Sequence, residues 1–241
     1  MHIAVVGSGI AGLGAAWLLR RQYAVTLYER NGYVGGHTHT LEVPTAAGAT
    51  PVDTGFMVFN HRNYPLLTGL FRHLNIATRK TDMSFGVSIG EGRVEYAGSN
   101  LATLMAQPRN WISATHYRML ADILRFNREA KSLLARDDLH GWTVADFLTH
   151  GGYSSAFRDR YLLPMAAAIW SCPTQTMATF PALSLFRFFF NHGLLDVSNR
   201  PQWHTVSGGS RSYVQRMLAD MEGCVSVDRP VQRVQRTESG V

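Results

Sequence analysis

The chain has 241 residues, 46% of them hydrophobic, and a formal net charge of +6. This length is enough for one large domain or two small ones with a buried core. The only cysteines, Cys172 and Cys224, lie far apart, which excludes a disulfide framework and indicates a reducing compartment.

The basic charge fits either a solvated surface or attraction to anionic lipid headgroups or an acidic substrate. Nucleic acid is not expected, because no helix-turn-helix, zinc or RNA-recognition pattern appears. The longest apolar stretch, around Tyr161 to Trp170, has about ten residues, whereas a membrane span needs ~20. We therefore expect a cytoplasmic protein that is at most peripheral at the inner membrane surface.

Residues 1–36 predict a strand, a glycine-rich turn, a helix and a second strand. The first strand covers residues 2–6, the helix 13–21, and the second strand 24–28. This arrangement, with an acid after the second strand, is the dinucleotide-binding fingerprint. The turn consists of Gly7, Ser8, Gly9, Ile10, Ala11 and Gly12.

Each residue type in this fingerprint has a physical role. Gly7 allows the tight turn, Gly9 leaves room for a pyrophosphate, and Gly12 lets helix and strand pack closely. The free N–H groups at the start of the helix attract phosphate. Glu29 can accept hydrogen bonds from a ribose diol, and its charge disfavours the 2′-phosphate of NADP, although the neighbouring Arg30 weakens that preference.

The segment after Glu29 favours FAD over NAD. It runs through Arg30 to the pair Gly35-Gly36 and then His37-Thr38. This segment resembles one in the flavin amine oxidases, phytoene desaturases and protoporphyrinogen oxidases, where paired glycines run along the FAD diphosphate. A plain NAD dehydrogenase would continue with another strand–helix repeat.

The middle of the chain predicts two short strands, a helix, a hairpin and then mainly helices. Gly55 lies beside aromatic residues, which fits either close approach to a flavin ring or a bulge in a strand. The aromatic stretch 180–191 fits a helical core or a wall for an apolar substrate. The expected elements are strands 41–43 and 51–53, helix 64–75, strands 84–89 and 93–96, helix 111–136, a short helix from Thr143 to Gly151, and a helix from Gly208 to Met221.

These patterns predict an α/β fold, with a Rossmann-like FAD-binding domain of parallel sheet plus β-meander and an inserted hairpin and helical substrate domain. The FAD-binding domain is expected at 1–59 and 201–241, and the substrate domain at 60–200. Residues 225–228 and 231–236 are expected as two strands, and Val231 is counted as a cofactor contact. An open edge at these strands predicts an N-terminal fragment of a longer flavoprotein.

Six segments spread along the chain carry a further resemblance: residues 35–40, 52–56, 63–65, 123–128, 161–171 and 200–203. In these segments the chain resembles predicted NAD/FAD-binding flavoproteins associated with cyclopropane-fatty-acyl-phospholipid synthases, within the flavin amine oxidase and phytoene desaturase-like superfamily. This resemblance implies an FAD-dependent oxidoreductase that acts on methylene-branched or unsaturated fatty-acyl chains by hydride transfer through flavin N5. It also implies a cyclopropane-synthase-like methyltransferase as partner.

No catalytic residue can be named from the sequence. His37, His39 and Tyr64 could donate a proton, but each could equally serve a structural role. No metal site is expected, because the histidine spacing is strand-like and no zinc pattern accompanies the cysteines. Two alternatives stay open: an FAD-dependent amine oxidase or isoprenoid desaturase, and a non-catalytic FAD-binding partner subunit of a methyltransferase.

Overall fold

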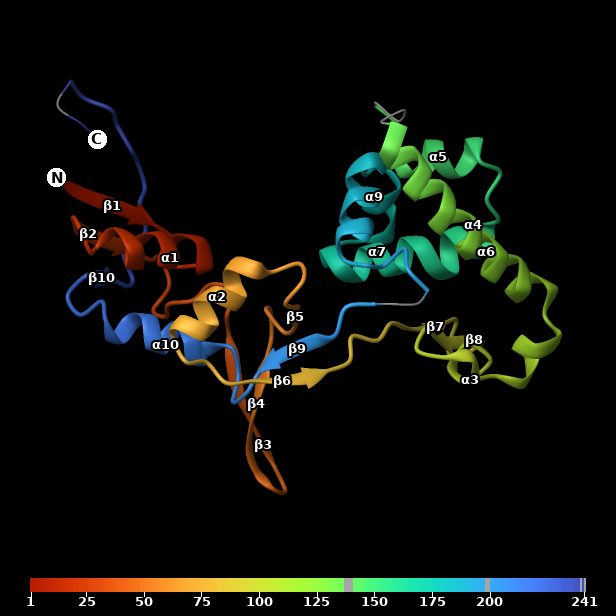
Figure 1. Ribbon diagram of the computed structural model, residues 1–241, viewed down its shortest axis with the longest axis horizontal. Coiled ribbons are helices and arrows are strands. Elements are labelled where there is room, and N and C mark those ends of the chain that lie inside the picture. The colour runs from red at the N-terminus through yellow and green to blue at the C-terminus, as the bar shows by residue number, and fades with distance from the viewer. Residues whose placement is uncertain (137–140, 198–199, 239, 241) are drawn as a thin grey trace. The chain divides into compact units, whose positions relative to one another are not determined.

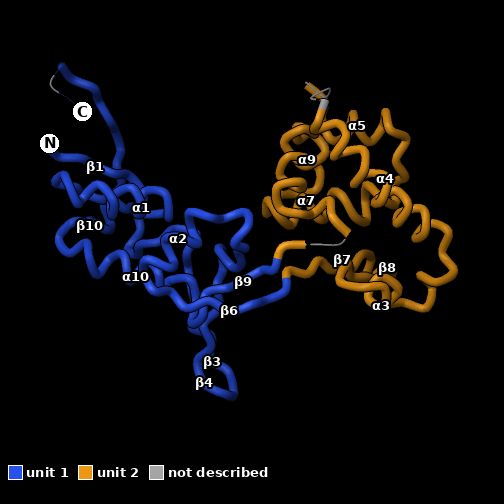
Figure 2. Tube along the Cα trace, in the orientation of Figure 1, with its two compact units in different colours: residues 1–82, 202–241 blue, residues 83–201 orange. Residues whose placement is uncertain are grey.

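The computed structural model describes residues 1–136, 141–197, 200–238 and 240 (Figure 1). The chain forms two compact units, with residues 1–82 and 202–241 in unit 1 and residues 83–201 in unit 2 (Figure 2). Unit 1 is therefore assembled from two segments that are far apart in the sequence.

Unit 1 combines a parallel sheet with antiparallel strands. Its elements are β1 (His2–Val6), α1 (Ile10–Leu19), β2 (Ala24–Tyr28), β3 (Thr40–Thr45), β4 (Gly48–Asp53), β5 (Phe59–Asn60), α2 (Pro65–His73), β6 (Thr78–Thr81), β9 (Trp203–Val206), α10 (Arg211–Ala219) and β10 (Val225–Ser226). The parallel sheet has the order β1-β2-β10, with Ile3 opposite Val25 and Val225 opposite Leu27. This sheet and its crossover helix confirm the α/β class and the Rossmann-like start.

The core of unit 1 lies where α1 and α10 pack. In α1, the buried residues Leu13, Ala16 and Trp17 follow the helical i, i+3, i+4 spacing. They belong to one apolar cluster with buried residues of α10, and Trp17 Nε1 donates to Asp220 at the end of α10 at 3.0 Å. The two separate segments of unit 1 are thus joined through a common core.

The antiparallel strands of unit 1 form a hairpin and a small sheet. β3 and β4 pair with Thr40 opposite Asp53. In the sheet β5-β9-β6 the central strand β9 comes from the second chain segment, so consecutive strands are not neighbours. The sequence predicted a β-meander, in which consecutive strands pair. In this sheet β5 and β6 instead each pair with β9, which lies far away in the sequence.

Unit 2 is mainly helical. Its elements are β7 (Gly86–Ile89), β8 (Val94–Ala97), α3 (Leu101–Leu104), a 3₁₀ turn (Pro108–Ile112), α4 (Ala114–Arg136), α5 (Val144–His150), α6 (Ser155–Phe157), a π turn (Arg158–Leu162), α7 (Leu163–Trp170), α8 (Thr174–Ala178) and α9 (Ala182–Asn191). Phe126 of α4 is fully buried, with its ring centroid 5.3 Å from that of Phe186 and 5.4 Å from that of Phe157. The aromatic stretch of α9 therefore contributes its buried face to this core.

The first boundary between the units differs from the predicted one. Residues 60–82 belong to unit 1, because β6 pairs with β9 and Phe71 of α2 packs in the unit 1 core. The Phe71 ring lies 5.1 Å from that of Tyr213 in α10. A helical pattern in one sequence does not reveal which core the helix joins.

Of the two strands predicted at 225–228 and 231–236, the first forms in a shorter version and the second is wrong. Only Val225–Ser226 is a strand, and it joins β2 in the parallel sheet. Asp228 takes a φ of +53° and Pro230 has no N–H to donate, so the chain leaves the sheet here. Residues 231–236 form no strand.

Candidate cofactor-binding site

The loop between β1 and α1 needs two of its glycines for the protein's own packing. Gly7 has a φ of +89°, and its N–H donates to the carbonyl oxygen of Tyr28 at 2.8 Å. It therefore makes the turn at the end of the sheet. A Cβ on Gly12 would lie 2.0 Å from the carbonyl oxygen of Gly7, so α1 approaches the loop only with glycine there.

Gly9 differs, because no atom of the described residues occupies the space that a side chain on it would fill. It is the N-cap of α1, with an ordinary φ of −60°, and a Cβ there would meet no atom within 4 Å. No side chain caps this helix end, and Ile10 and Ala11 in its first turn are exposed. The free N–H groups and the open space suit an anionic group against the backbone.

Glu29 follows β2 and is held by four hydrogen bonds. Its Oε2 accepts from the N–H of Ser8 at 2.9 Å and from the Ser8 hydroxyl at 2.6 Å. Its Oε1 accepts from the backbone N–H of Asn31 at 2.9 Å and from Asn31 Nδ2 at 3.0 Å. Burial raises the pKa of Glu29, but the hydrogen bonds from Ser8 and Asn31 outweigh it, so the pKa lies below its ordinary value. The carboxylate is therefore buried and ionised.

The second glycine pair lies against the first loop. Gly9 and Gly35 form a parallel bridge, and the N–H of Gly35 donates to the carbonyl oxygen of Ser8 at 3.1 Å. Gly36 has a φ of +58°, and a Cβ on it would lie 3.0 Å from the Cα of Gly9. The structure thus brings together the glycine loop, Glu29 and the Gly35–Gly36 pair.

Thr38 is connected to α10 by a hydrogen bond that the sequence did not predict. Its hydroxyl pairs with the hydroxyl of Tyr213, and both residues are buried. Burial raises the pKa of Tyr213, so its hydroxyl keeps its proton. The Thr38 N–H also donates to the carbonyl oxygen of Gly35 at 3.0 Å. α10 therefore supports the loop that carries the second glycine pair.

Asp53 holds the start of α10 in place. Its carboxylate accepts from the N–H of Ser210 at 2.9 Å, from the Ser210 hydroxyl at 2.7 Å and from the Thr40 hydroxyl at 2.5 Å. Sequence analysis missed Asp53, Ser210 and Tyr213 as supporting residues. The sequence shows that Asp53 ends a predicted strand and that Ser210 lies at the start of a predicted helix. It contains no signal that these two distant residues form hydrogen bonds with each other.

Three residues considered as proton donors have different surroundings. His37 is exposed. The Nδ1 of His39 lies 3.0 Å from the hydroxyl of Thr54, and its ring lies 4.9 Å from that of Tyr33. Burial raises the pKa of Tyr64, which keeps its phenol neutral. None of these contacts assigns a catalytic role.

Three further predicted site residues lie at the margin of this cluster. A Cβ on Gly55 would lie 2.3 Å from the carbonyl oxygen of His37, so close approach of protein backbone already explains this glycine. Arg30 is exposed. Val231 is 39% exposed and follows Arg229, whose N–H donates to the carbonyl oxygen of Glu29 at 2.8 Å. Val231 is thus two residues from a backbone contact with the acid.

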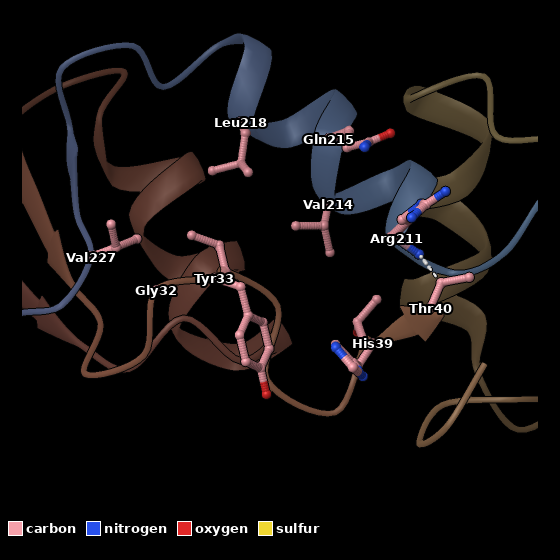
Figure 3. A pocket seen from close by; sticks show the side chains of 11 residues that line it. Gly32, Tyr33, His39, Thr40, Arg211, Val214, Gln215, Leu218 and Val227 are labelled. Carbon is pink, nitrogen blue, oxygen red and sulfur yellow. Dashed lines mark hydrogen bonds between the residues drawn. The ribbon is translucent and has the colours of Figure 1, made fainter. Parts of the chain in front are cut away.

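A pocket of about 400 Å³ lies beside the cluster in unit 1 (Figure 3). Figure 3 shows Val214, Gln215 and Leu218 coming from α10, with Tyr33 and His39 on the facing loop. The pocket shares Thr38 with the predicted site but contains neither Glu29 nor the first glycine loop. Its lining residues are Gly32, Tyr33, Val34, Thr38, His39, Thr40, Arg211, Val214, Gln215, Leu218 and Val227.

The described residues contain neither a metal-binding cluster nor a membrane-spanning helix. Within residues 1–136, 141–197, 200–238 and 240, no group of three or more His, Cys, Asp or Glu side chains could hold a metal ion. In the same part of the chain, no helix is long and apolar enough to cross a membrane. Cys172 and Cys224 are free thiols.

The residues present fit the adenosine diphosphate half of FAD. The open space at Gly9 accommodates a diphosphate, and the ionised Glu29 is an acceptor for a ribose diol. The family model for flavin containing amine oxidoreductases matches residues 10–241. The chain belongs to this family. FAD is the family's cofactor, which confirms the choice of FAD over NAD.

Individual relatives agree with this assignment. The carotenoid phi-ring synthase of Streptomyces griseus is 30% identical over 215 residues, covering 83% of this chain and 41% of that protein. Cyclohexylamine oxidase from Brevibacterium oxydans shares the fold, with a TM-score of 0.66, 20% identity, and coverage of 99% of this chain and 53% of that one. A variant of putrescine oxidase gives a TM-score of 0.64 at 23% identity, covering 95% of this chain and 51% of that one. The chain spans about half the length of these proteins, or less.

Proposed function

We propose that this chain binds FAD and serves an FAD-dependent oxidoreductase that oxidises an amine. The observation that carries the proposal is the assembly of Gly9, Glu29 and the Gly35–Gly36 pair around an open space. When bound, FAD would supply the redox chemistry, with the flavin as the hydride acceptor. Family membership and the amine oxidase fold support the choice of an amine.

The chain's own residues would bind and orient the cofactor. The N–H groups at the start of α1 would receive the diphosphate, and Glu29 would accept hydrogen bonds from the ribose diol. Thr38 and Tyr213 would hold the Gly35–Gly36 loop in position. Each contribution is one of binding or orientation, and no proton transfer is assigned to a residue.

A second candidate substrate is a carotenoid or another isoprenoid. It is favoured by the 30% identity to the carotenoid phi-ring synthase and by 48% identity over 40 residues to a 1-hydroxycarotenoid 3,4-desaturase of Flavobacterium. The fatty-acyl substrate and the methyltransferase partner are supported by the sequence resemblance alone, because the names of the relatives and solved structures reported above refer to amines or carotenoids. Both remain predictions of the sequence.

The test is anaerobic reduction of the flavin in the FAD-reconstituted chain. We expect putrescine or cyclohexylamine to bleach the absorbance of the oxidised flavin. Saturation of a methylene-branched chain needs the opposite electron flow, so that phospholipid, in detergent, would be added to chemically reduced flavin, where we expect no reoxidation. Bleaching by a carotenoid alone would favour the second candidate, and reoxidation of the reduced flavin by the phospholipid, without bleaching by an amine, would support the fatty-acyl interpretation. A flavin that binds but that none of them reduces would contradict the proposed activity. Gly9→Val, which should bind no flavin, controls for free FAD.

A further inference from the structure

Ser8 joins the three parts of the candidate site. The residue is fully buried. Its N–H and its hydroxyl both lie within hydrogen-bonding distance of Oε2 of Glu29, at 2.9 and 2.6 Å. The N–H of Gly35 donates to the Ser8 carbonyl oxygen at 3.1 Å and approaches the Ser8 hydroxyl oxygen at 3.3 Å. One small side chain therefore contacts both the acid and the second glycine pair.

The direction of these hydrogen bonds follows from their chemistry. A hydroxyl has one proton to donate and can accept from other donors. Because the N–H of Gly35 approaches the Ser8 oxygen, the Ser8 proton is left for the carboxylate of Glu29. A hydroxyl-to-carboxylate bond of this length is charge-assisted and stronger than a neutral one. With Asn31 holding the other carboxylate oxygen, Glu29 keeps a single orientation without a ligand.

We propose that Ser8 is a positioning residue for the cofactor. Its hydroxyl orients Glu29 for the ribose diol and keeps Gly35 beside Gly9. The inference rests on the proposed FAD binding and deepens it, since the ligand chemistry addressed is that of an adenosine diphosphate. The lowered pKa of Glu29, to which the Ser8 hydroxyl contributes, agrees with this role. The fingerprint gives roles to its glycines, to the helix start and to the acid, and none to the side chain at this position.

The test compares Ser8→Ala with a matched control, Ser212→Ala. Ser212 lies in the same unit, and its buried hydroxyl has no hydrogen-bond partner among the described residues. FAD and ADP affinities would be measured by calorimetry across the acid pH range. We expect Ser8→Ala to bind both ligands about tenfold more weakly, corresponding to about 1.4 kcal/mol, and the control to stay within about twofold.

A second readout separates positioning from a general loss of structure. The titration of Glu29, followed by carboxyl ¹³C NMR in the ligand-free chain, should show a higher pKa in Ser8→Ala and no change in Ser212→Ala. In a Glu29→Gln background, removing the Ser8 hydroxyl should lower ADP affinity less than in the wild-type background, because the charged partner is already gone and only the contact with Gly35 is lost.

The outcomes distinguish the inference from the proposed function. Wild-type ADP affinity together with an unchanged Glu29 titration in Ser8→Ala would overturn the positioning role, while FAD binding would stand. If the wild-type chain binds neither FAD nor ADP, the proposed function fails and the positioning role fails with it. Weaker binding with a raised Glu29 pKa supports the inference, whether or not an amine reduces the flavin.

Discussion

Replacing Gly12 by alanine would test why α1 can lie so close to the glycine loop. A Cβ at this position would lie 2.0 Å from the carbonyl oxygen of Gly7 and 3.5 Å from Cγ1 of Val5. Ordinary contact begins near 3.4 Å, so the shortfall at Gly7 is about 1.4 Å (3.4 − 2.0). Forcing a methyl group into a packed site costs ~1–3 kcal/mol. We expect the upper end, because the obstacle is backbone that cannot rotate away.

Gly9→Ala is the matched control, since it makes the same chemical change three residues earlier. Its Cβ meets no atom within 4 Å and its φ of −60° suits alanine. We expect the fold to tolerate it, with a gain of up to ~0.4–1 kcal/mol from the reduced entropy of the unfolded chain. FAD affinity should nevertheless fall, because the methyl group occupies the space assigned to the diphosphate.

Urea unfolding followed by circular dichroism, together with FAD titration, would separate the two effects. Gly12→Ala should lower both stability and FAD affinity, whereas Gly9→Ala should lower affinity alone. Equal stability of the two variants would refute the account of the contact between α1 and the loop. Unchanged FAD affinity in Gly9→Ala would show that the diphosphate does not lie there.

Three further predictions concern the rest of the fold. Burial lowers the pKa of His116, so at a pH below the ordinary pKa of 6.5 the unfolded chain binds a proton here that the folded chain does not. The free energy of unfolding should therefore fall as the pH drops below that value. His116→Gln should reduce this loss, measured by urea unfolding at several pH values. Asp53→Asn should cost ~1–3 kcal/mol by weakening the hydrogen bonds to Ser210, with faster hydrogen exchange in α10. Asp82, an exposed acid in the same unit, is the control, and Asp82→Asn should leave this exchange unchanged. Phe126→Ala should cost ~3–5 kcal/mol in thermal unfolding because it empties the centre of the unit 2 core; a cost below ~1 kcal/mol would contradict that packing.

Local patterns in the sequence predicted which residues lie together at the start of α1, while their role as cofactor contacts stays a prediction. The fingerprint residues Gly7 to Gly12, Glu29 and the Gly35–Gly36 pair come together as expected, because a strand, a tight turn and a crossover helix leave few alternatives. The short helix predicted from Thr143 also forms, and it begins with a capping box in which the Thr143 hydroxyl accepts from the N–H of Asp146 at 3.1 Å.

Long-range pairings could not be predicted from one sequence. The contact between Thr38 and Tyr213 and the hydrogen bonds of Asp53 to Ser210 join the two segments of unit 1. The strand pattern at 231–236 failed because alternation cannot show whether a partner strand is available. Gly55 was open to two explanations, and the structure supplies a backbone neighbour, His37.

The most direct test of the central claim is to identify the nucleotide that this chain retains. The wild-type chain and Gly9→Val would be incubated with a mixture of FAD, FMN, NAD and NADP, desalted and denatured, and the released nucleotide identified by chromatography. We expect FAD from the wild-type chain and none from Gly9→Val, with both proteins folded by circular dichroism. NADP, no nucleotide from the wild-type chain, or equal FAD from both would contradict it.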